Sequence, residues 1–379
     1  MSADFIYAPF FRARREEAKV FTGFDFGDNM IPGIEIFRGP VAKPRRKKKG
    51  MEQQQELLQI NASGIPFEKL YLPTLGRIKS KKIFVDIPVH MERRGTSKEV
   101  TAFLSAVAYQ REIRTAYMLK LAPLSKKIIP VISTYYKLGE PGSIKKQEVD
   151  LRGTFARLAF RTFLDTFDQD MCVVRELARE GDYLILDLKE NLSTPSQPEI
   201  ADIIEALKDF DKCPVIILRS VICKTITNLS LTSGAPVERI DNSLMSNYKQ
   251  FHATGFGDYA GIKKDDLVKS GGNKNTKPSP GFIIYDPIGD TYFGFRGSDK
   301  RTWSDFEDVI VPEVLNSSMA SNMALSPRNY LAEANQGWTL LKKIHDKSEK
   351  GKNAGKFKRI SMEHYIFCLK TKINSGDFS

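Results

Sequence analysis

The sequence predicts an α/β protein built as a (β/α)8 barrel that resembles a TIM barrel. Short apolar runs recur along the first 262 residues, several are rich in valine and isoleucine on both faces, and helical segments separate many of them. Strands buried on both sides are typical of parallel sheets, and alternating strands and helices are typical of βαβ units. Closing eight such strands into a barrel removes both exposed sheet edges. An open doubly wound sheet is the competing fold.

Eight apolar runs are the expected strands. They are residues 5–11, 30–37, 82–90, 127–134, 171–177, 183–190, 214–220 and 256–262. Four segments with helical periodicity lie between them, namely residues 97–121, 154–167, 198–210 and 222–251. The third begins with a helix-start signal: Ser196 as N-cap, Pro198 in the first turn and Glu199 three residues after the serine.

The alternation of apolar runs and helical segments stops after the eighth run. The chain is therefore expected to have two parts: a barrel over residues 1–262, with an insert at about 40–75, and an extension over 263–379. A loop rich in Gly, Lys and Pro opens the extension. Two aromatic-rich runs within 281–297 then flank a Pro-Ile-Gly-Asp turn and predict a β-hairpin. The rest is partly helical and basic, with Trp303 and Trp338 expected to anchor it on the barrel.

Composition limits the class of protein. With 379 residues and 41% hydrophobic residues, the chain has enough apolar material for a large core. No run approaches the roughly 18 apolar residues of a membrane span, and the N-terminus lacks a signal-peptide pattern, so we expect a cytoplasmic protein without a membrane partner. The four cysteines show no CxxC spacing, which predicts reduced thiols.

Positive charge is concentrated in two segments of the chain, whose formal net charge is +12. The second, residues 342–372, is partly helical and contains Phe357. The first, KPRRKKKG, has six cations in seven residues: Lys43, Arg45, Arg46, Lys47, Lys48 and Lys49. Such a run can follow a nucleic-acid backbone, although a solvated loop is the alternative, since no aromatic residue interrupts it to stack on bases.

Polar residues within or at the ends of the apolar runs define the candidate site, because the carboxyl ends of all strands of a parallel barrel lie at one mouth. The segment YLILDLKE shows the pattern, an apolar run that ends in Asp187 and Lys189. The candidate catalytic residues are Asp187, Lys189, Arg219 and Asp258, and the candidate substrate-binding residues are Arg12, Glu35, Arg175 and Tyr259. Asp86 and His90 lie in the third run. The alternative is that these charges only pair with each other and hold the strand ends in register.

Each candidate has an expected role if the mouth is catalytic. Arg219 and Arg12 hold a phosphate, Asp187 or Asp258 acts as general base, and Lys189 stabilises developing charge. Mg²⁺ is a candidate cofactor if four carboxylates converge, since hard cations prefer oxygen ligands; these are Glu35, Asp86, Asp187 and Asp258. The sequence contains no P-loop, no GxSxG and no HExxH motif.

Five segments resemble the prokaryotic and phage beta protein family: FIYAPFFRARREEAKVF, MIPGIEI, DYLILDL, VIILRS and FGDYAGI. The resemblance covers most of residues 5–262, and the chain departs from it in the long basic insert. The family pattern falls on Glu17, Pro32, Glu35, Asp187, Arg219, Gly257, Asp258 and Tyr259. The resemblance implies a setting in phage–host conflict, as a phage or an antiviral defence protein.

Two functions follow. The first is binding of nucleic acid or of a protein partner from a defence system, through the basic segments. The alternative is an enzyme of hydrolase or lyase type that acts on a phosphate-bearing substrate or nucleotide at the barrel mouth. The sequence does not decide between them and does not give an oligomeric state.

Overall fold

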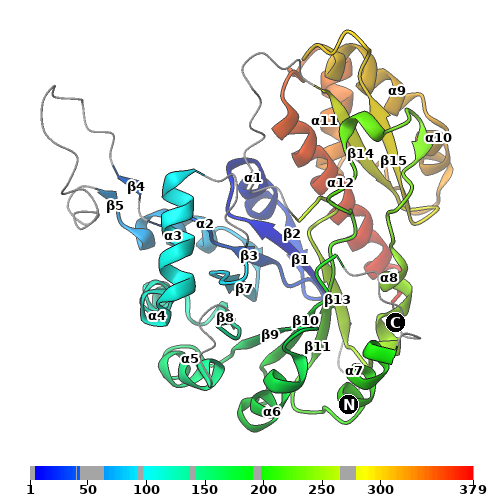
Figure 1. The fold of residues 1–379 in the computed structure, drawn as a ribbon. Helices are drawn as coiled ribbons and strands as arrows, with labels where there is room; N and C mark the ends of the chain where they lie inside the picture. The colour runs from blue at the N-terminus through cyan, green and yellow to red at the C-terminus, as the bar shows by residue number, and fades with distance from the viewer. Residues whose placement is uncertain are drawn as a thin grey trace, which may run out of the picture.

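The computed structural model describes residues 5–39, 41–42, 64–91, 97–135, 142–190, 198–264 and 279–378. Eight parallel strands form a closed barrel in the order β1, β13, β11, β10, β9, β8, β7, β3 (Figure 1). They are β1 (Ile6–Arg12), β3 (Gly33–Glu35), β7 (Ile83–Asp86), β8 (Ile128–Ile132), β9 (Ala159–Phe163), β10 (Tyr183–Asp187), β11 (Val215–Leu218) and β13 (Gly255–Asp258). The predicted (β/α)8 fold is confirmed, and the open doubly wound sheet is wrong.

Helices follow the strands and surround the barrel. They are α1 (Arg15–Gly23), α2 (Phe67–Gly76), α3 (Lys98–Tyr109), α4 (Arg111–Leu119), α5 (Ser143–Arg152), α6 (Phe167–Leu177), α7 (Pro198–Lys208) and α8 (Ser243–Asn247). The predicted helix over 97–121 is two helices, because the backbone of Gln110 is extended between α3 and α4. The expected cap Ser196 lies outside the described residues. No helix of the described ranges is long and apolar enough to cross a membrane.

The predicted strand over 171–177 is wrong, because these residues belong to helix α6. Met171 and Val174 are buried and Arg175 is exposed, which is the spacing of an amphipathic helix rather than a strand. The missing barrel strand is β9, which lies inside the segment predicted as a helix over 154–167. All five β9 residues are buried, including Arg161, so the strand lacks the purely apolar pattern used to find the others.

The predicted helix over 222–251 is also wrong. Only α8 and two short 3-10 turns, Asn228–Ser230 and Tyr248–Phe251, are helical there. Gly234 adopts a φ of +73°, and the strand β12 (Ala235–Pro236) that follows pairs with the hairpin of the C-terminal part. A left-handed glycine and a proline break the helix, and tertiary pairing then determines the local structure.

The predicted hairpin is confirmed. Strands β14 (Gly281–Asp286) and β15 (Thr291–Arg296) pair antiparallel, with a turn at 287–290. A π-helical turn (Phe306–Ile310) and helices α9 (Val311–Leu315), α10 (Ser318–Leu325) and α11 (Gln336–His345) follow. Trp338 is buried as expected, whereas Trp303 is 51% exposed and does not act as a buried anchor. Two small pairings complete the fold: β2 (Asp25–Gly27) with β6 (Lys79–Ser80), and β4 (Val41–Ala42) with β5 (Gly64–Ile65).

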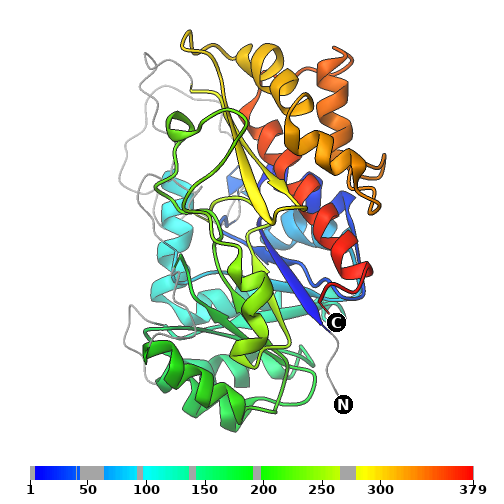
Figure 2. The ribbon, with the colours of Figure 1, turned by 90° about the vertical axis from the view of Figure 1, so that its right-hand side faces the viewer.

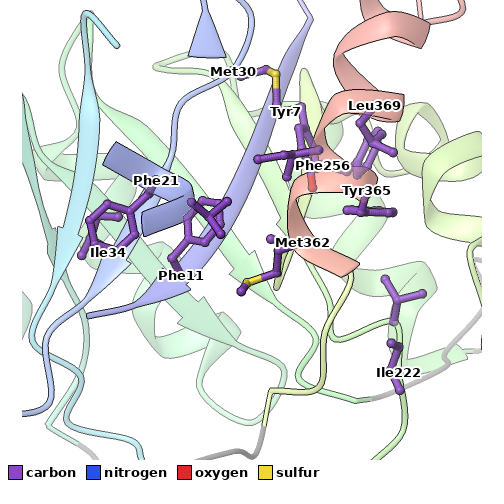
Figure 3. Close-up of a cluster of buried hydrophobic side chains, with 14 of the residues drawn as sticks. Tyr7, Phe11, Phe21, Met30, Ile34, Ile222, Phe256, Met362, Tyr365 and Leu369 are labelled. Atoms are coloured by element: carbon purple, nitrogen blue, oxygen red, sulfur yellow. The ribbon is translucent and has the colours of Figure 1, made fainter. Parts of the chain in front are cut away.

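The long helix α12 (Ala354–Asn374) covers the barrel beside α1 (Figures 1 and 2). The two helices run parallel, because Gly355 lies close to Glu16 at their starts and Lys370 contacts Asp25 at their ends. Figure 3 shows Tyr365 and Leu369 of α12 near Phe256 of β13. Helix α12 therefore takes the place of the helix that follows the eighth strand, although the C-terminal hairpin and three helices come between them in the sequence.

Strand register determines which side chains enter the barrel. Residues paired side by side in neighbouring strands face the same way, and alternate residues face opposite ways. The barrel interior below the carboxyl mouth is apolar. It contains Ala8, Phe10, Phe84, Ile129, Val131, Ala159, Tyr183, Ile185, Ile216 and Leu218. Toward the carboxyl ends the same alternation turns charged residues inward: Arg12 pairs with Glu35, and Glu35 pairs with Asp86. The polar site is therefore at the mouth, above a closed apolar interior.

Candidate functional site

Arg161 lies at the centre of the barrel mouth and is fully buried. Its guanidinium donates hydrogen bonds to three carboxylates, with shortest N–O distances of 3.0 Å to Glu35, 2.7 Å to Asp86 and 2.6 Å to Asp187. It also donates to the Tyr259 hydroxyl at 2.9 Å. We call these five residues the Arg161 cluster. A planar guanidinium suits this position because its fixed donors reach several carboxylates at once.

Two further cations neutralise the cluster from outside it. Arg114 of α4 donates to Asp86 at 3.1 Å and to the carbonyl oxygens of Ile87 and Val131, which ties the helix to the ends of β7 and β8. Lys264, in the loop after β13, lies 3.0 Å from Asp187. Burial alone would raise the pKa of Asp187, but Lys264 and Arg161 lower it well below its usual value. Asp187 is therefore a fixed carboxylate, not a proton acceptor at neutral pH.

Lys189 contributes to the cluster through its backbone. Its amide donates to Asp187 at 2.8 Å, and its φ of +57° makes this turn possible. Its side chain extends to the surface and pairs with Asp165 at 3.4 Å. Lys189, expected to stabilise developing charge, thus directs its ammonium group away from the cluster, and the ammonium group next to Asp187 belongs to Lys264.

His90 follows β7 at the same mouth, with its ring centroid 4.8 Å from that of Phe163 on β9. Burial, together with the positive charges of Arg161 and Lys264, holds its pKa well below the usual value, so the imidazole is neutral at physiological pH. Within the described ranges neither buried ring nitrogen has a hydrogen-bond partner. A neutral imidazole in this state can accept or donate a proton to a bound molecule.

Arg12 extends the site from the end of β1. It is 4% exposed, its Nε lies 3.7 Å from Glu35, and its guanidinium lies 5.9 Å from the centre of the Tyr259 ring. Its backbone amide donates to Glu17 on α1. Burial raises the pKa of Glu17, although Arg12 and Arg14 lower it in part.

Asp258 does not join the Arg161 cluster. It pairs with Pro9 in the register and so faces outward, whereas its neighbours Gly257 and Tyr259 face the barrel axis. Its carboxylate accepts hydrogen bonds from Tyr7 at 2.8 Å and from Tyr365 of α12. Burial raises the pKa of Asp258 to about 6. The residue therefore fastens α12 to the barrel wall.

Arg219 and Arg175 also lie outside the cluster. Arg219 is the residue after the inward-facing Leu218; it points outward and donates to the Asp241 carbonyl oxygen at 2.9 Å. Arg219 and Asp258 line the same small cavity, together with Tyr365. Arg175 is on the outer helix α6, where its guanidinium donates to the carbonyl oxygen of Ala206 and lies 6.0 Å from the centre of the Phe210 ring.

The carboxylates proposed for Mg²⁺ do not form a metal-binding group. Asp258 faces away, and the Arg161 guanidinium lies between Glu35, Asp86 and Asp187. Among the residues that the structure describes, no group of three or more His, Cys, Asp or Glu has a geometry suited to a metal ion.

Of the two basic segments, the structure describes the one over residues 342–372. Residues 43–49 lie outside the described residues. In the segment 342–372, Phe357 is buried in the core and is not a stacking surface. Several cations there have acidic partners: Lys347 pairs with Asp308, Lys356 with Glu349, Arg359 with Glu363 and Lys372 with Asp290.

Sequence reasoning missed Arg161 and Lys264. Arg161 was hidden in the segment predicted as a helix, although AFRTF also reads as a strand that places Ala159, Arg161 and Phe163 on one face. Lys264 follows the eighth run, in the kind of loop that forms the mouth of a parallel barrel. Glu35, Asp187, Tyr259 and Arg12 were placed correctly at the mouth.

The molecule is a parallel β/α barrel with a buried ionic cluster at its carboxyl mouth. The chain matches the family model described as "Beta protein" over residues 7–368. It therefore belongs to the beta protein family. The match continues through the C-terminal part as far as α12. No curated protein and no solved structure matches the chain.

Proposed function

We propose that the protein is an enzyme whose active site is the carboxyl mouth of the barrel and whose substrate is a small phosphate-bearing molecule. The observation that carries the proposal is the combination of the buried Arg161 cluster and the neutral imidazole of His90, whose ring nitrogens have no hydrogen-bond partner among the described residues. The Arg161 cluster supplies fixed dipoles and charges in a dry environment, where they act strongly on a bound molecule.

His90 is the proposed proton-transfer group. Its imidazole is neutral and, in the described part of the chain, its ring nitrogens have no hydrogen-bond partner. Lys264 and Arg161 provide positive charge next to it, which suits stabilisation of negative charge that develops on a substrate oxygen. Asp187 holds both cations in place through contacts of 3.0 Å and 2.6 Å.

The role for Asp187 differs from general base catalysis. Its lowered pKa makes it a weak proton acceptor, so it is proposed as a positioning residue for Lys264 and Arg161. Tyr259 stays protonated at neutral pH because burial and the charge of Glu35 raise its pKa well above the usual value. Its hydroxyl is thus a hydrogen-bond donor directed toward the carboxylate of Glu35, at 3.4 Å.

The test is an untargeted turnover screen. Purified wild-type protein and the His90→Gln variant are incubated with a library of nucleotides and phosphorylated metabolites, and mass spectrometry measures which compounds are consumed. We expect at least one phosphate-bearing compound to be consumed by wild type and to persist with the variant. Arg175→Gln serves as the control, because this arginine is exposed on α6, and it should behave like wild type. If wild type consumes nothing, or if His90→Gln consumes the same compounds at the same rate, the proposal is wrong.

A second proposal concerns the basic run Lys43 to Lys49, whose six charges in seven residues favour binding to a nucleic-acid backbone. The setting in phage–host conflict belongs with it and is supported by the family resemblance alone. Deleting 43–49 should weaken retention of DNA or RNA on a filter at low salt and leave turnover by the barrel mouth unchanged. Equal retention with and without the run would exclude this role.

A further inference from the structure

A group of cations surrounds the start of helix α1, next to the Arg161 cluster but distinct from it. Arg12 ends β1, and Arg14 is the N-cap residue of α1, two positions later. Lys358 approaches from α12: a Cβ built on Gly355 would lie 3.3 Å from Cγ of Glu16, and Lys358 lies one turn further along that helix. Glu17 is the acidic residue that these cations share. We call Arg12, Arg14 and Lys358 the rim cations.

The rim cations lie close enough to act on one another's pKa values, with Glu17 as their shared acid and Glu35 next to Arg12. Burial, together with the charges of Arg14, Arg12 and Lys263, lowers the pKa of Lys358 to about 8 despite the opposing effect of Glu17. Burial likewise lowers the pKa of Arg14, and the nearby Arg12 and Arg38 add to this effect. Like charges that are held together in a partly buried site repel one another. An anion that binds between them relieves this repulsion and lowers the free energy of the site.

Arg12 shows that hydrogen-bonding capacity is unused at this place. Its side chain is 95% buried, yet in the described ranges its buried Nε has no hydrogen-bond partner, and the Glu35 carboxylate lies 3.7 Å away from it. A buried guanidinium normally has its donors satisfied, since an unmet charged donor costs free energy. An oxygen atom of a bound ligand would accept a hydrogen bond from this donor.

The N-termini of helices α1 and α12 add partial positive charge to that of the rim cations. Helices α1 and α12 run parallel and begin side by side, so both helix N-termini face the mouth. The N-cap residue of α1, Arg14, provides no side-chain cap. Partial positive charge at helix N-termini favours phosphate, and here it adds to three side-chain cations.

We infer that the rim cations form the subsite for the phosphate group of the substrate. Together with the nearby Arg38 and Lys263, the rim cations outnumber the neighbouring carboxylates Glu17 and Glu35, and this excess of positive charge favours a phosphate dianion over a single carboxylate. Arg12 and Arg14 would bind the phosphate oxygens through their guanidinium forks, and Lys358 would close the subsite from α12. This inference rests on the proposed function for its substrate, and it places the substrate's reacting part over the Arg161 cluster and His90.

The experiment measures binding of inorganic pyrophosphate by isothermal titration calorimetry. The proteins are wild type, Arg14→Gln, Lys358→Gln and the double variant. Two controls remove one charge each nearby: Arg15→Gln, which is exposed on α1, and Lys352→Gln, which pairs with Glu307 away from the rim. We expect wild type and both controls to bind alike, each rim variant to bind at least about ten-fold more weakly, and the double variant to show the largest loss.

Two results would overturn the inference: no pyrophosphate binding by wild type at millimolar concentrations, or rim variants that bind as tightly as the controls. The calorimetry tests the phosphate subsite independently of the turnover screen that tests the proposed enzyme. If His90→Gln abolishes turnover while the rim variants bind pyrophosphate normally, the enzyme proposal stands and the subsite is wrong. If the rim variants lose binding and no compound is turned over, the anion site stands without the enzyme.

Discussion

Replacing Arg161 by methionine should destabilise the protein strongly. The arginine makes five hydrogen bonds, to Glu35, Asp86, Asp187 and Tyr259. Without it, Asp86 keeps Arg114 and Asp187 keeps Lys264, but Glu35 keeps Arg12 at 3.7 Å and the Tyr259 hydroxyl at 3.4 Å, both longer contacts than the one it loses. Removing one partner of a buried ion pair costs about 3–5 kcal/mol, because the remaining charge is left uncompensated. Methionine has a similar volume, so little of this cost comes from a cavity.

The assay is urea denaturation of Arg161→Met and wild type at about pH 8 and about pH 5. The free energy of unfolding should fall by about 4 kcal/mol at the higher pH, a large part of a typical total of about 5–15 kcal/mol. The loss should be smaller at the lower pH, because the three carboxylates of the variant can then take up protons and lose their mutual repulsion.

Two further variants show whether the loss of stability in Arg161→Met comes from the buried charges. Arg175→Met removes an exposed arginine from α6 and should cost less than about 1 kcal/mol. Adding Glu35→Gln to Arg161→Met should recover part of the lost stability, because it removes the carboxylate with the weakest remaining partner. A cost of Arg161→Met no larger than that of Arg175→Met would refute the view that Arg161 neutralises the mouth. A cost independent of pH would refute its electrostatic origin.

Three further predictions follow from other residues. Burial raises the pKa of Asp258 from 3.8 to about 6, so its contribution to stability is present below about pH 4 and is lost as pH rises through about 6. The stability of wild type relative to Asp258→Asn should therefore fall by about 3 kcal/mol between about pH 4 and pH 7 in urea titrations, and a constant difference would contradict this. The difference in pyrophosphate affinity between wild type and Lys358→Gln should shrink as pH rises through about 8, where Lys358 loses its charge; calorimetry at several pH values checks it. A Cβ on Gly255 would lie 1.8 Å from the Ile6 carbonyl oxygen, so Gly255→Ala should force β1 and β13 apart and lower stability by about 1–3 kcal/mol or more in thermal melts, whereas Gly153→Ala, whose Cβ meets nothing within 4 Å, should change little.

Much of the barrel could be predicted because its strands are buried on both faces. Runs such as YLIL and VIIL need no partner information to be recognised, since both of their faces are apolar. The error at β9 has a definite physical origin. Arg161 is tolerated in a buried strand only because Glu35, Asp86 and Asp187 arrive from three other strands, and no local pattern contains that information.

The candidate site was predictable as far as strand direction allowed. The rule that carboxyl ends share one mouth placed Glu35, Asp187 and Tyr259 correctly. It did not distinguish inward from outward residues, and this misplaced Asp258 and Arg219. Both lie one position from an inward-facing residue, and one position reverses the direction of a side chain in a strand. Knowing the register of β1 against β13 would have corrected Asp258.

The position of α12 affects how the chain can fold during its synthesis. The ribosome makes β13 well before α12, because the hairpin and helices α9, α10 and α11 are translated between them. Until α12 has emerged, the outer side of β1 and β13 lacks its cover, and apolar Phe256 together with the Tyr7–Asp258 pair faces solvent or a chaperone. The nascent barrel thus stays unfinished while nearly a hundred residues are added, and a ribosome stalled in that interval would hold an aggregation-prone intermediate.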